Sequence, residues 1–361
     1  MAKFYWMSTL AATWNTAASS TRWSNAPGGA FTSSIPGAGD DVFFDASSPS
    51  NCIVGSGTYA CRSINFTGYT RTFNHNVGTL NIGDGTPGDG NIALKLVAGM
   101  TYTGTTSAMN FVSTSTTQQT IDCGGKTLSV VTFNGANSSY LLTSDFASNG
   151  YLTITSGTFN TGSNYDVTTG AIASTGTNSR TITLNGSVIT LSTTWSISGS
   201  NVTVNSGTST INMVVPVPTG TFAGAGFVYN IVNFGSIGGF GANTITMSGN
   251  NTFDTLTFAS VVSSAVNVKF TAGSTTTITN ALNFNGISTN LITVASTVSG
   301  TQYTILKNNT LVHAVYVGLK DCIGAGEQKY FASNSVDNGN NVNWRFNAPN
   351  RGSQSLLGCG I

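Results

Sequence analysis

Charged side chains are scarce in this chain of 361 residues. Asp, Glu, Lys and Arg together make up 7% of it, whereas about 25% is usual for a soluble domain. The formal net charge is +1, and the Lys and Arg residues are scattered singly rather than gathered in a stripe. Because binding to a phosphate backbone depends on clustered positive charge, we expect no nucleic-acid partner.

Long apolar runs are also missing. No stretch approaches the roughly 18 apolar residues of a membrane-spanning helix, so we expect no membrane span. The opening "MAKFYW" is not followed by the continuous apolar segment of a secretory signal peptide, so we expect no export by the general secretory route. A virion protein, made in the host cytoplasm and released by lysis, needs no such signal.

Helix signals are nearly absent as well. Ala, Leu, Glu and Lys never cluster at three-to-four spacing, and the chain has a single glutamate, Glu327. The apolar fraction is nevertheless 39% and the aromatic fraction 10%, which is enough to form a core and argues against disorder. The composition therefore predicts an all-β fold.

Short apolar-polar-apolar triplets recur along the chain, and such alternation places one face of a strand inward. The triplets are Ile64-Asn65-Phe66, Leu80-Asn81-Ile82, Met109-Asn110-Phe111, Leu152-Thr153-Ile154, Ile182-Thr183-Leu184, Val202-Thr203-Val204, Ile245-Thr246-Met247, Leu256-Thr257-Phe258 and Leu282-Asn283-Phe284. Clusters of Gly, Asn and Ser separate them, and these residues tolerate the backbone of tight corners. The triplets predict strands of about three to five residues.

A weak internal repeat accompanies the triplets. "QTIDCGGKTLSVVTFNG" (residues 119–135) aligns without gaps to "GTFAGAGFVYNIVNFGS" (residues 220–236), so that Ile121 matches Phe222 and Phe133 matches Phe234. Stacked coils leave such self-similarity, because each coil meets the same steric requirements. Short strands favour a parallel β-helix, or β-solenoid, with capped ends; tandem β-sandwich domains are the alternative.

Both ends of the chain differ from its middle. Residues 1–45 hold Trp6, Trp14 and Trp23 together with the acidic patch Asp40, Asp41 and Asp45. An open coil edge would pair with other chains unless it were blocked, so we interpret the ends as caps. The predicted organisation is a Trp-rich N-terminal cap or attachment segment over residues 1–50, a solenoid body over 51–310, and a C-terminal capping segment and tail over 311–361.

The stretch "SVDNGNNVNWRF" (residues 335–346) lies in that last segment. Its Ser, Asn and Gly residues are turn formers, and Trp344 and Phe346 share one face of a strand in the alternation that follows. We interpret the stretch as the closing strand of the stack, with Trp344 covering the apolar end of the last coil.

The two ends also carry a resemblance. "KFYWMSTLAATWNTAASSTRWSNAPGGAFTSSIPGAGDDVFFDASS" resembles the opening of a largely uncharacterised group of phage and phage-like proteins, with its W…W-S pair, Gly-Gly, Pro and Asp-Asp-Val-x-Phe-Asp. "VYVGLKDCIGAGEQKYFASNSVDNGNNVNWRF" is similar to the C-terminal close of that group. The middle is similar only in texture, and the tail "NAPNRGSQSLLGCGI" extends beyond the match.

The resemblance implies a β-solenoid virion or surface protein. The leading hypothesis is a non-enzymatic structural protein of a phage particle, a tail-fibre or appendage component for host attachment. The alternatives are a capsid decoration (head fibre) protein, a polysaccharide-degrading tailspike and a bacterial surface adhesin. Expected partners are other virion proteins and a host surface glycan; phage β-helices are commonly homotrimers, although no heptad region is present here.

Residues with catalytic potential are few. Glycosidases use two carboxyl groups about 5 to 9.5 Å apart, and no cluster of acids with aromatic platforms is visible. Asp321 with Glu327 is the first pair to consider, while Asp122 or Asp145 would approach Asp254 only by an accident of register. The sequence thus assigns no catalytic, cofactor-binding or metal residues.

Metal-site patterns are incomplete. His75 and His313 lack the spacing of a zinc site or a catalytic triad. "GDGTPGDGN" and "DNGNN" are similar to oxygen-rich calcium loops, but neither has the full spacing or a terminal bidentate glutamate. Calcium at Asp337 is therefore an alternative to a plain turn.

The five cysteines are Cys52, Cys61, Cys123, Cys322 and Cys359, and their spacing matches no zinc pattern. Cys52 and Cys61 flank "IVGSGTYA", so two neighbouring strands could bring them into a disulfide. Synthesis in a cytosol favours free, buried thiols instead.

Overall fold

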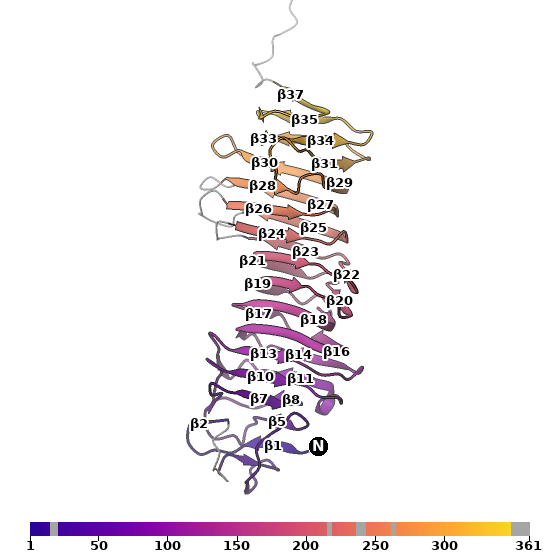
Figure 1. The fold of residues 1–361 in the computed structure, drawn as a ribbon. Coiled ribbons are helices and arrows are strands. Elements are labelled where there is room, and N and C mark those ends of the chain that lie inside the picture. Colours follow the sequence, from indigo (N-terminus) through magenta and orange to yellow (C-terminus); the bar gives the residue numbers. More distant parts are fainter. Residues whose placement is uncertain (15–20, 215–218, 236–242, 261–264, 348–361) are drawn as a thin grey trace, which may run out of the picture. The chain divides into compact units, whose positions relative to one another are not determined.

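A computed structural model describes residues 1–14, 21–214, 219–235, 243–260 and 265–347 (Figure 1). Regular structure in this part of the chain is β-strand apart from one 3-10 turn, η1 (Asp89–Asn91). The chain forms two compact units, Met1–Thr210 and Ile211–Ile361. Among the described residues, no helix has the length and apolar character needed to cross a membrane. The all-β prediction is confirmed.

The strands of the first unit are β1 (Lys3–Trp6), β2 (Ala12–Thr13), β3 (Trp23–Ser24), β4 (Phe31–Thr32), β5 (Asp41–Phe43), β6 (Cys52–Ile53), β7 (Thr58–Cys61), β8 (Ser63–Asn65), β9 (Thr72–Asn74), β10 (Thr79–Ile82), β11 (Ile92–Lys95), β12 (Thr101–Thr103), β13 (Ala108–Phe111), β14 (Gln118–Asp122), β15 (Thr127–Leu128), β16 (Val130–Leu142), β17 (Phe146–Ser148), β18 (Tyr151–Asn160), β19 (Val167–Ser174), β20 (Arg180–Thr183), β21 (Val188–Ile197) and β22 (Val202–Asn205). The strand β23 (Thr210–Met213) crosses the boundary between the units. The strands of the second unit are β24 (Thr219–Ala223), β25 (Val228–Gly235), β26 (Asn243–Ser248), β27 (Asn251–Ala259), β28 (Val266–Phe270), β29 (Thr275–Asn285), β30 (Ile292–Ser296), β31 (Tyr303–Lys307), β32 (Val312–Val315), β33 (Val317–Leu319), β34 (Cys322–Ala325), β35 (Tyr330–Ser333), β36 (Val336–Asp337) and β37 (Trp344–Asn347).

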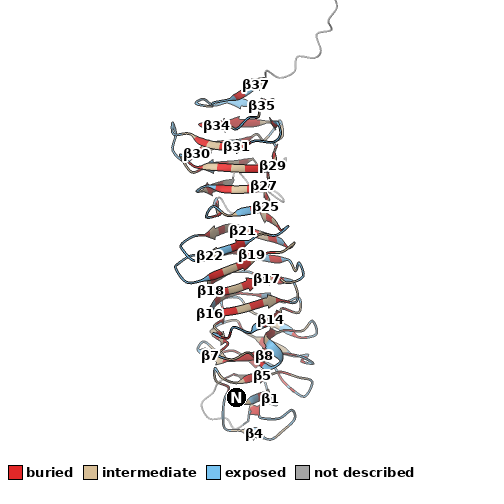
Figure 2. Cartoon of the chain, turned by 90° about the vertical axis from the view of Figure 1, so that its right-hand side faces the viewer, coloured by how far each residue is buried: buried red, intermediate tan, exposed pale blue. Residues whose placement is uncertain are grey.

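Strands of the first unit pair in parallel with strands one coil away, which is the arrangement of a parallel β-helix. Ile82 pairs with Cys61 on one side and with Phe111 on the other, and Phe111 pairs in turn with Phe133. All four side chains are buried, so this column runs through the interior. The residues that alternate with these along each strand face outward. Figure 2 shows the alternation of buried and intermediate residues along the strands. Parallel pairing of successive coils contradicts the alternative of tandem β-sandwiches.

The start of the first unit is closed by tryptophan and a short antiparallel ribbon. Strand β3 pairs antiparallel with both β1 and β4, whereas β1 pairs parallel with β5. The ring centroids of Trp6 and Trp14 each lie 5.1 Å from that of Trp23, and all three side chains are buried. The change of strand direction ends the parallel ladder, and the aromatic cluster covers the interior of the first coil.

Several strands are longer than the predicted three to five residues, and this part of the prediction is wrong. Strand β16 has 13 residues because it continues round a corner of the coil. Its first part pairs with β13 and its second part with β14, and its register with β18 shifts between Asn134 and Ser139. Gly135 lies in this corner, where an added Cβ would stand 1.9 Å from the carbonyl oxygen of Ser113. A side chain at residue 135 would therefore force the two coils apart.

The second unit repeats the same design. Strand β27 pairs in parallel with β25 and β29, and this register aligns Phe234, Phe258 and Phe284. Their rings stack in sequence, with centroid separations of 5.3 and 5.4 Å and interplanar angles of 14° and 17°. The aromatic column is the core of these coils and contributes dispersion as well as burial.

The internal repeat corresponds to equivalent positions in the two units. Ile121 and Phe222 are both buried, and so are Phe133 and Phe234. The intervening glycines, Gly125 and Gly226, have φ of 72° and 80°, which favours glycine. Of the predicted triplets, all but the one at Val202 have both apolar members buried. The predicted boundaries at residues 50 and 310 stay predictions, since the compact units follow a different division.

The closing stretch joins the preceding coil through backbone hydrogen bonds and through side-chain amides. Asn341 accepts a hydrogen bond from the backbone nitrogen of Cys322 and donates to the carbonyl oxygen of Leu319. Asn343 donates to the carbonyl oxygen of Gly324. These amides supply donors and acceptors that a further coil would otherwise provide. Strand β37 then pairs with β35, so that Trp344 stands beside Tyr330, as the interpretation of a closing strand requires.

Candidate functional site

Tyr151 marks one candidate surface, in the first unit. It is 57% exposed, whereas many aromatic side chains of this fold line the interior. Its strand neighbour on the next coil is Ala171, which is too small to cover the ring. Two positions along β18, Thr153 pairs with Thr132 and Ala173 in an outward row of small side chains. An exposed phenol ring beside hydroxyl groups is a surface to which a neutral sugar can stack and donate hydrogen bonds.

A pair of hydrogen-bonded amides extends this outward row. Asn110 pairs with Thr132 and with Asn81, and its side-chain nitrogen donates to the side-chain oxygen of Asn81 at 2.9 Å. This hydrogen bond holds the two amides side by side on the strand face. The surface therefore combines hydroxyl and amide groups without charge in this row.

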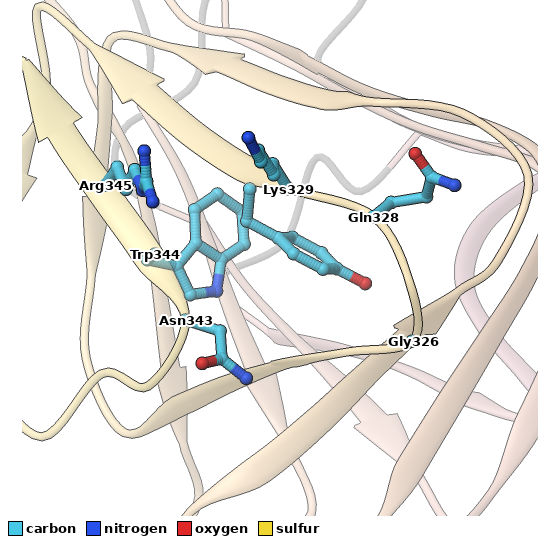
Figure 3. A pocket seen from close by; sticks show the side chains of 7 residues that line it. Gly326, Gln328, Lys329, Asn343, Trp344 and Arg345 are labelled. Atoms are coloured by element: carbon cyan, nitrogen blue, oxygen red, sulfur yellow. The ribbon is translucent and has the colours of Figure 1, made fainter.

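A depression in the second unit is the other candidate, and it has a different chemistry. Its volume is about 440 Å³, and its lining residues are Gly326, Gln328, Lys329, Tyr330, Asn343, Trp344 and Arg345 (Figure 3). These residues come from β35, from β37 and from the turns that precede both strands. The depression therefore exists only once β37 has closed against β35.

The aromatic floor of the depression is rigid. The ring centroids of Tyr330 and Trp344 lie 5.0 Å apart, and both side chains are buried, with 9% of Trp344 exposed. The Tyr330 hydroxyl lies 2.9 and 2.8 Å from the carbonyl oxygens of Ile305 and Ala325. Burial raises the pKa of Tyr330 to about 12, so it is neutral at physiological pH.

Two cations border this floor. Lys329 and Arg345 are exposed, and within the residues that the structure describes neither has an acidic partner; the ion pairs there are Lys3 with Asp89 and Arg62 with Asp41. A pair of uncompensated cations beside an aromatic floor favours an anionic ligand that also has an apolar face.

The first acidic pair suggested by the sequence does not behave as a pair. Asp321 is buried, and its two carboxylate oxygens accept hydrogen bonds from Asn340 Nδ2 at 2.7 Å and from the Gly300 nitrogen at 3.2 Å. Glu327 is exposed in the turn before β35. Asp321 thus holds neighbouring coils together. Asp122 and Asp145 belong to the first unit and Asp254 to the second.

The carboxylates of the two calcium-like loops already have hydrogen-bond or ion-pair partners. In the first, Asp84 accepts from the backbone nitrogen of Thr86 at 2.8 Å, and Asp89 pairs with Lys3 at 2.9 Å. In the second, Asp337 Oδ1 accepts from the Gly339 nitrogen and from Asn341 Nδ2. No group of three or more His, Cys, Asp or Glu suited to a metal occurs in the described residues. Calcium at Asp337 stays a prediction.

The cysteines that the structure describes are free and buried. Cys52 lies on β6 and Cys61 on β7, which belong to different sheets. The suggested Cys52–Cys61 disulfide is therefore wrong, and the expectation of free thiols is confirmed for these two residues, Cys123 and Cys322. Burial raises the pKa of the Cys123 thiol to about 12, which leaves it unreactive. Cys359 and the tail beyond residue 347 lie outside the described residues.

The two histidines have different surroundings. His313 is exposed, and its Nε2 lies 2.8 Å from Ser333 Oγ. His75 is fully buried, with Nδ1 3.1 Å from the Tyr102 hydroxyl. Burial lowers the pKa of His75 to about 4. His75 is therefore a neutral core residue at physiological pH.

His75 makes the stability of the first unit depend on pH. Its folded-state pKa is below the unfolded value of about 6.5, so the unfolded chain binds the proton more tightly. The stabilising contribution is complete above pH 6.5 and is lost as the pH falls towards 4. We expect urea unfolding, followed by tryptophan fluorescence, to give about 2 kcal/mol less stability at pH 5 than at pH 7. His75→Gln should remove most of this difference, and His313→Gln should keep it; the reverse pattern would contradict the assignment.

Comparisons with known proteins identified no relative of this chain. No family model, no curated protein and no solved structure matches the chain.

Proposed function

We propose that the protein is a non-enzymatic structural component of a bacteriophage particle, in a tail fibre or similar appendage that attaches to the host surface. The observation that carries the proposal is the outward face of the first unit, where a row of Thr and Asn side chains lies two positions along the strand from the exposed ring of Tyr151. Such a face offers many shallow hydrogen-bonding positions and no assembled catalytic group. It suits adhesion to a glycan better than turnover of one.

Two further observations support the proposal. The N- and C-terminal segments resemble those of phage β-solenoid proteins, and the parallel coils of each unit are compatible with such a protein. Rigid parallel coils hold surface groups at fixed spacing, which favours multivalent contact with a repeating polymer.

The location of the protein tests the proposal. We expect immunogold electron microscopy, with an antibody against this protein, to label the tail or its appendages on particles from the lysate in which it is made. Label over the head would favour a capsid decoration protein instead. Particles without label would overturn the proposal and favour a bacterial adhesin or an enzyme instead. Release of reducing sugars from host polysaccharide by the purified protein would overturn the non-enzymatic assignment in favour of a tailspike.

A further inference from the structure

We propose that the depression between β35 and β37 binds a carboxylate-bearing sugar, such as a uronic acid unit of an acidic surface polysaccharide. The inference rests on the proposed function, because it names the class of glycan that an attachment protein would meet. It concerns a different surface from the neutral face around Tyr151.

The position of the two cations is the first step. Tyr330 pairs with Trp344; Lys329 directly precedes Tyr330 in the turn before β35, and Arg345 directly follows Trp344 in β37, so the two cations border the aromatic pair. Figure 3 shows both side chains beside the indole of Trp344. A guanidinium binds a carboxylate through two parallel hydrogen bonds, and an ammonium adds a point charge. Both groups favour a carboxylate over an uncharged ring substituent.

The two amides supply the second step. Gln328 already donates through Nε2 to the carbonyl oxygen of Asn308 at 3.1 Å, and Asn343 donates through Nδ2 to that of Gly324 at 3.0 Å. Their amide oxygens therefore remain as acceptors for hydroxyl groups. A ligand that presents a carboxylate and several hydroxyls satisfies both sets of groups, whereas a simple inorganic anion satisfies only the cations.

Size and shape are the third step. A volume of about 440 Å³ lies within the roughly 300 to 1,000 Å³ range of small-molecule sites. The exposed edge of Trp344 offers a narrow apolar wall rather than a full stacking platform, since the indole is mostly buried. The depression therefore suits one end or one branch of a sugar chain, held mainly by charge and hydrogen bonds.

One acidic residue near the depression, Glu327, should repel an anionic ligand and therefore provides a further test. Glu327 lies in the same turn as Gly326 and Gln328 but does not line the depression. The other acids that the structure describes in this unit, Asp254, Asp321 and Asp337, all accept hydrogen bonds from neighbouring groups. Removing the charge of Glu327 should therefore strengthen binding of an anionic sugar, because like charges repel across a short distance.

The experiment measures binding of an oligogalacturonate to the full-length protein by calorimetry, with its methyl ester as a neutral ligand of the same backbone. We expect the double variant Lys329→Gln/Arg345→Gln to bind the acid at least about tenfold more weakly, because two charge-assisted hydrogen-bonding groups are lost. Lys269→Gln removes an exposed cation of β28 in the same unit and should leave affinity within about twofold. Glu327→Gln should bind the acid more tightly. Unchanged melting temperatures would show that the variants are folded.

Several results would overturn the inference: equal binding of acid and ester, equal loss in Lys269→Gln and the double variant, or no binding of the acid. If a glycerol-phosphate polymer bound more tightly than the oligogalacturonate, the ligand group of the site would be a phosphate and not a carboxylate. Binding of the same variants to host cells separates this inference from the proposed function. If the wild-type protein and the double variant bind cells equally, the proposed attachment function is retained and the proposed sugar site is refuted. If wild-type protein neither binds cells nor labels particles, the proposed function fails, whatever the depression binds.

Discussion

Replacing Trp344 with Ala should lower the free energy of unfolding of the second unit by about 3 to 5 kcal/mol. Trp344 is 9% exposed, and its ring packs on Tyr330 in the neighbouring strand. Its removal takes away a large apolar contact and uncovers the interior beneath β37. Chemical denaturation followed by circular dichroism measures the loss, and hydrogen exchange of the β35 amides should quicken as the last coil frays.

A neighbouring residue provides the control for Trp344. Val342 lies two positions earlier, is 43% exposed and forms a backbone bridge with Ile323 that a substitution by Ala can keep. Val342→Ala should change stability by less than about 0.5 kcal/mol. Equal unfolding midpoints in Trp344→Ala and Val342→Ala would mean that the indole does not close the stack.

Features that depend on one coil could be predicted from the sequence. Triplets such as Leu80-Asn81-Ile82 alternate because every strand has one inward face, and that requirement is local. The corner glycines and the Trp-rich start follow from equally local chemistry. The β-helix was therefore predictable without knowing which coils are neighbours.

Features that join coils could not be predicted, because the coil length varies. Asn81 and Asn110 are hydrogen-bonded across 29 residues, but Asn212 and Asn233 across 21. Lateral neighbours are set by these lengths, and the short triplets do not fix them. Asp145, for example, accepts a hydrogen bond from the Asp166 backbone nitrogen one coil later, which no spacing rule indicated.

The same reason explains why the depression in the second unit was missed. Lys329 and Arg345 are ordinary exposed cations in the sequence, and only the register of β35 with β37 places them around Trp344. The basic residues adjacent to Tyr330 and Trp344 were the available signal, but the sequence alone gave no reason to pair them. Asp41 was noticed as part of an acidic patch, whereas its partner Arg62 was not.

Replacing Arg62 with Met should destabilise the first unit by about 3 to 5 kcal/mol at pH 7, because it leaves the Asp41 carboxylate buried without its cation. The Asp41 and Arg62 side chains are 1% and 7% exposed. Arg62 Nε donates to Asp41 Oδ1 at 2.9 Å, and Nη2 donates to Oδ2 of the same carboxylate. Ser63 Oγ and the Asp89 nitrogen also donate to Asp41 Oδ1.

The pH dependence of this loss identifies its cause. Burial alone would raise the pKa of Asp41, but the hydrogen bonds from Arg62, Ser63 and the Asp89 backbone outweigh burial and lower it. A lowered folded-state pKa stabilises above the unfolded pKa of about 3.9, and this contribution is lost as the pH falls through the folded value. In Arg62→Met the cation is gone, so burial raises the pKa and acid protonates the carboxyl in the folded protein. The stability difference between wild type and variant should therefore shrink from pH 7 to pH 4.

Neutralising the carboxylate at pH 7 provides the matched control. Asp41→Asn combined with Arg62→Met removes both charges and should recover a large part of the loss, since the remaining amide can keep its contacts with Ser63 and the Asp89 nitrogen. Comparison at each pH cancels the separate titration of His75, which is common to all these proteins. If Arg62→Met lost the same free energy at both pH values and Asp41→Asn gave no rescue, the contribution of Arg62 would lie in the packing of its alkyl chain rather than in its charge.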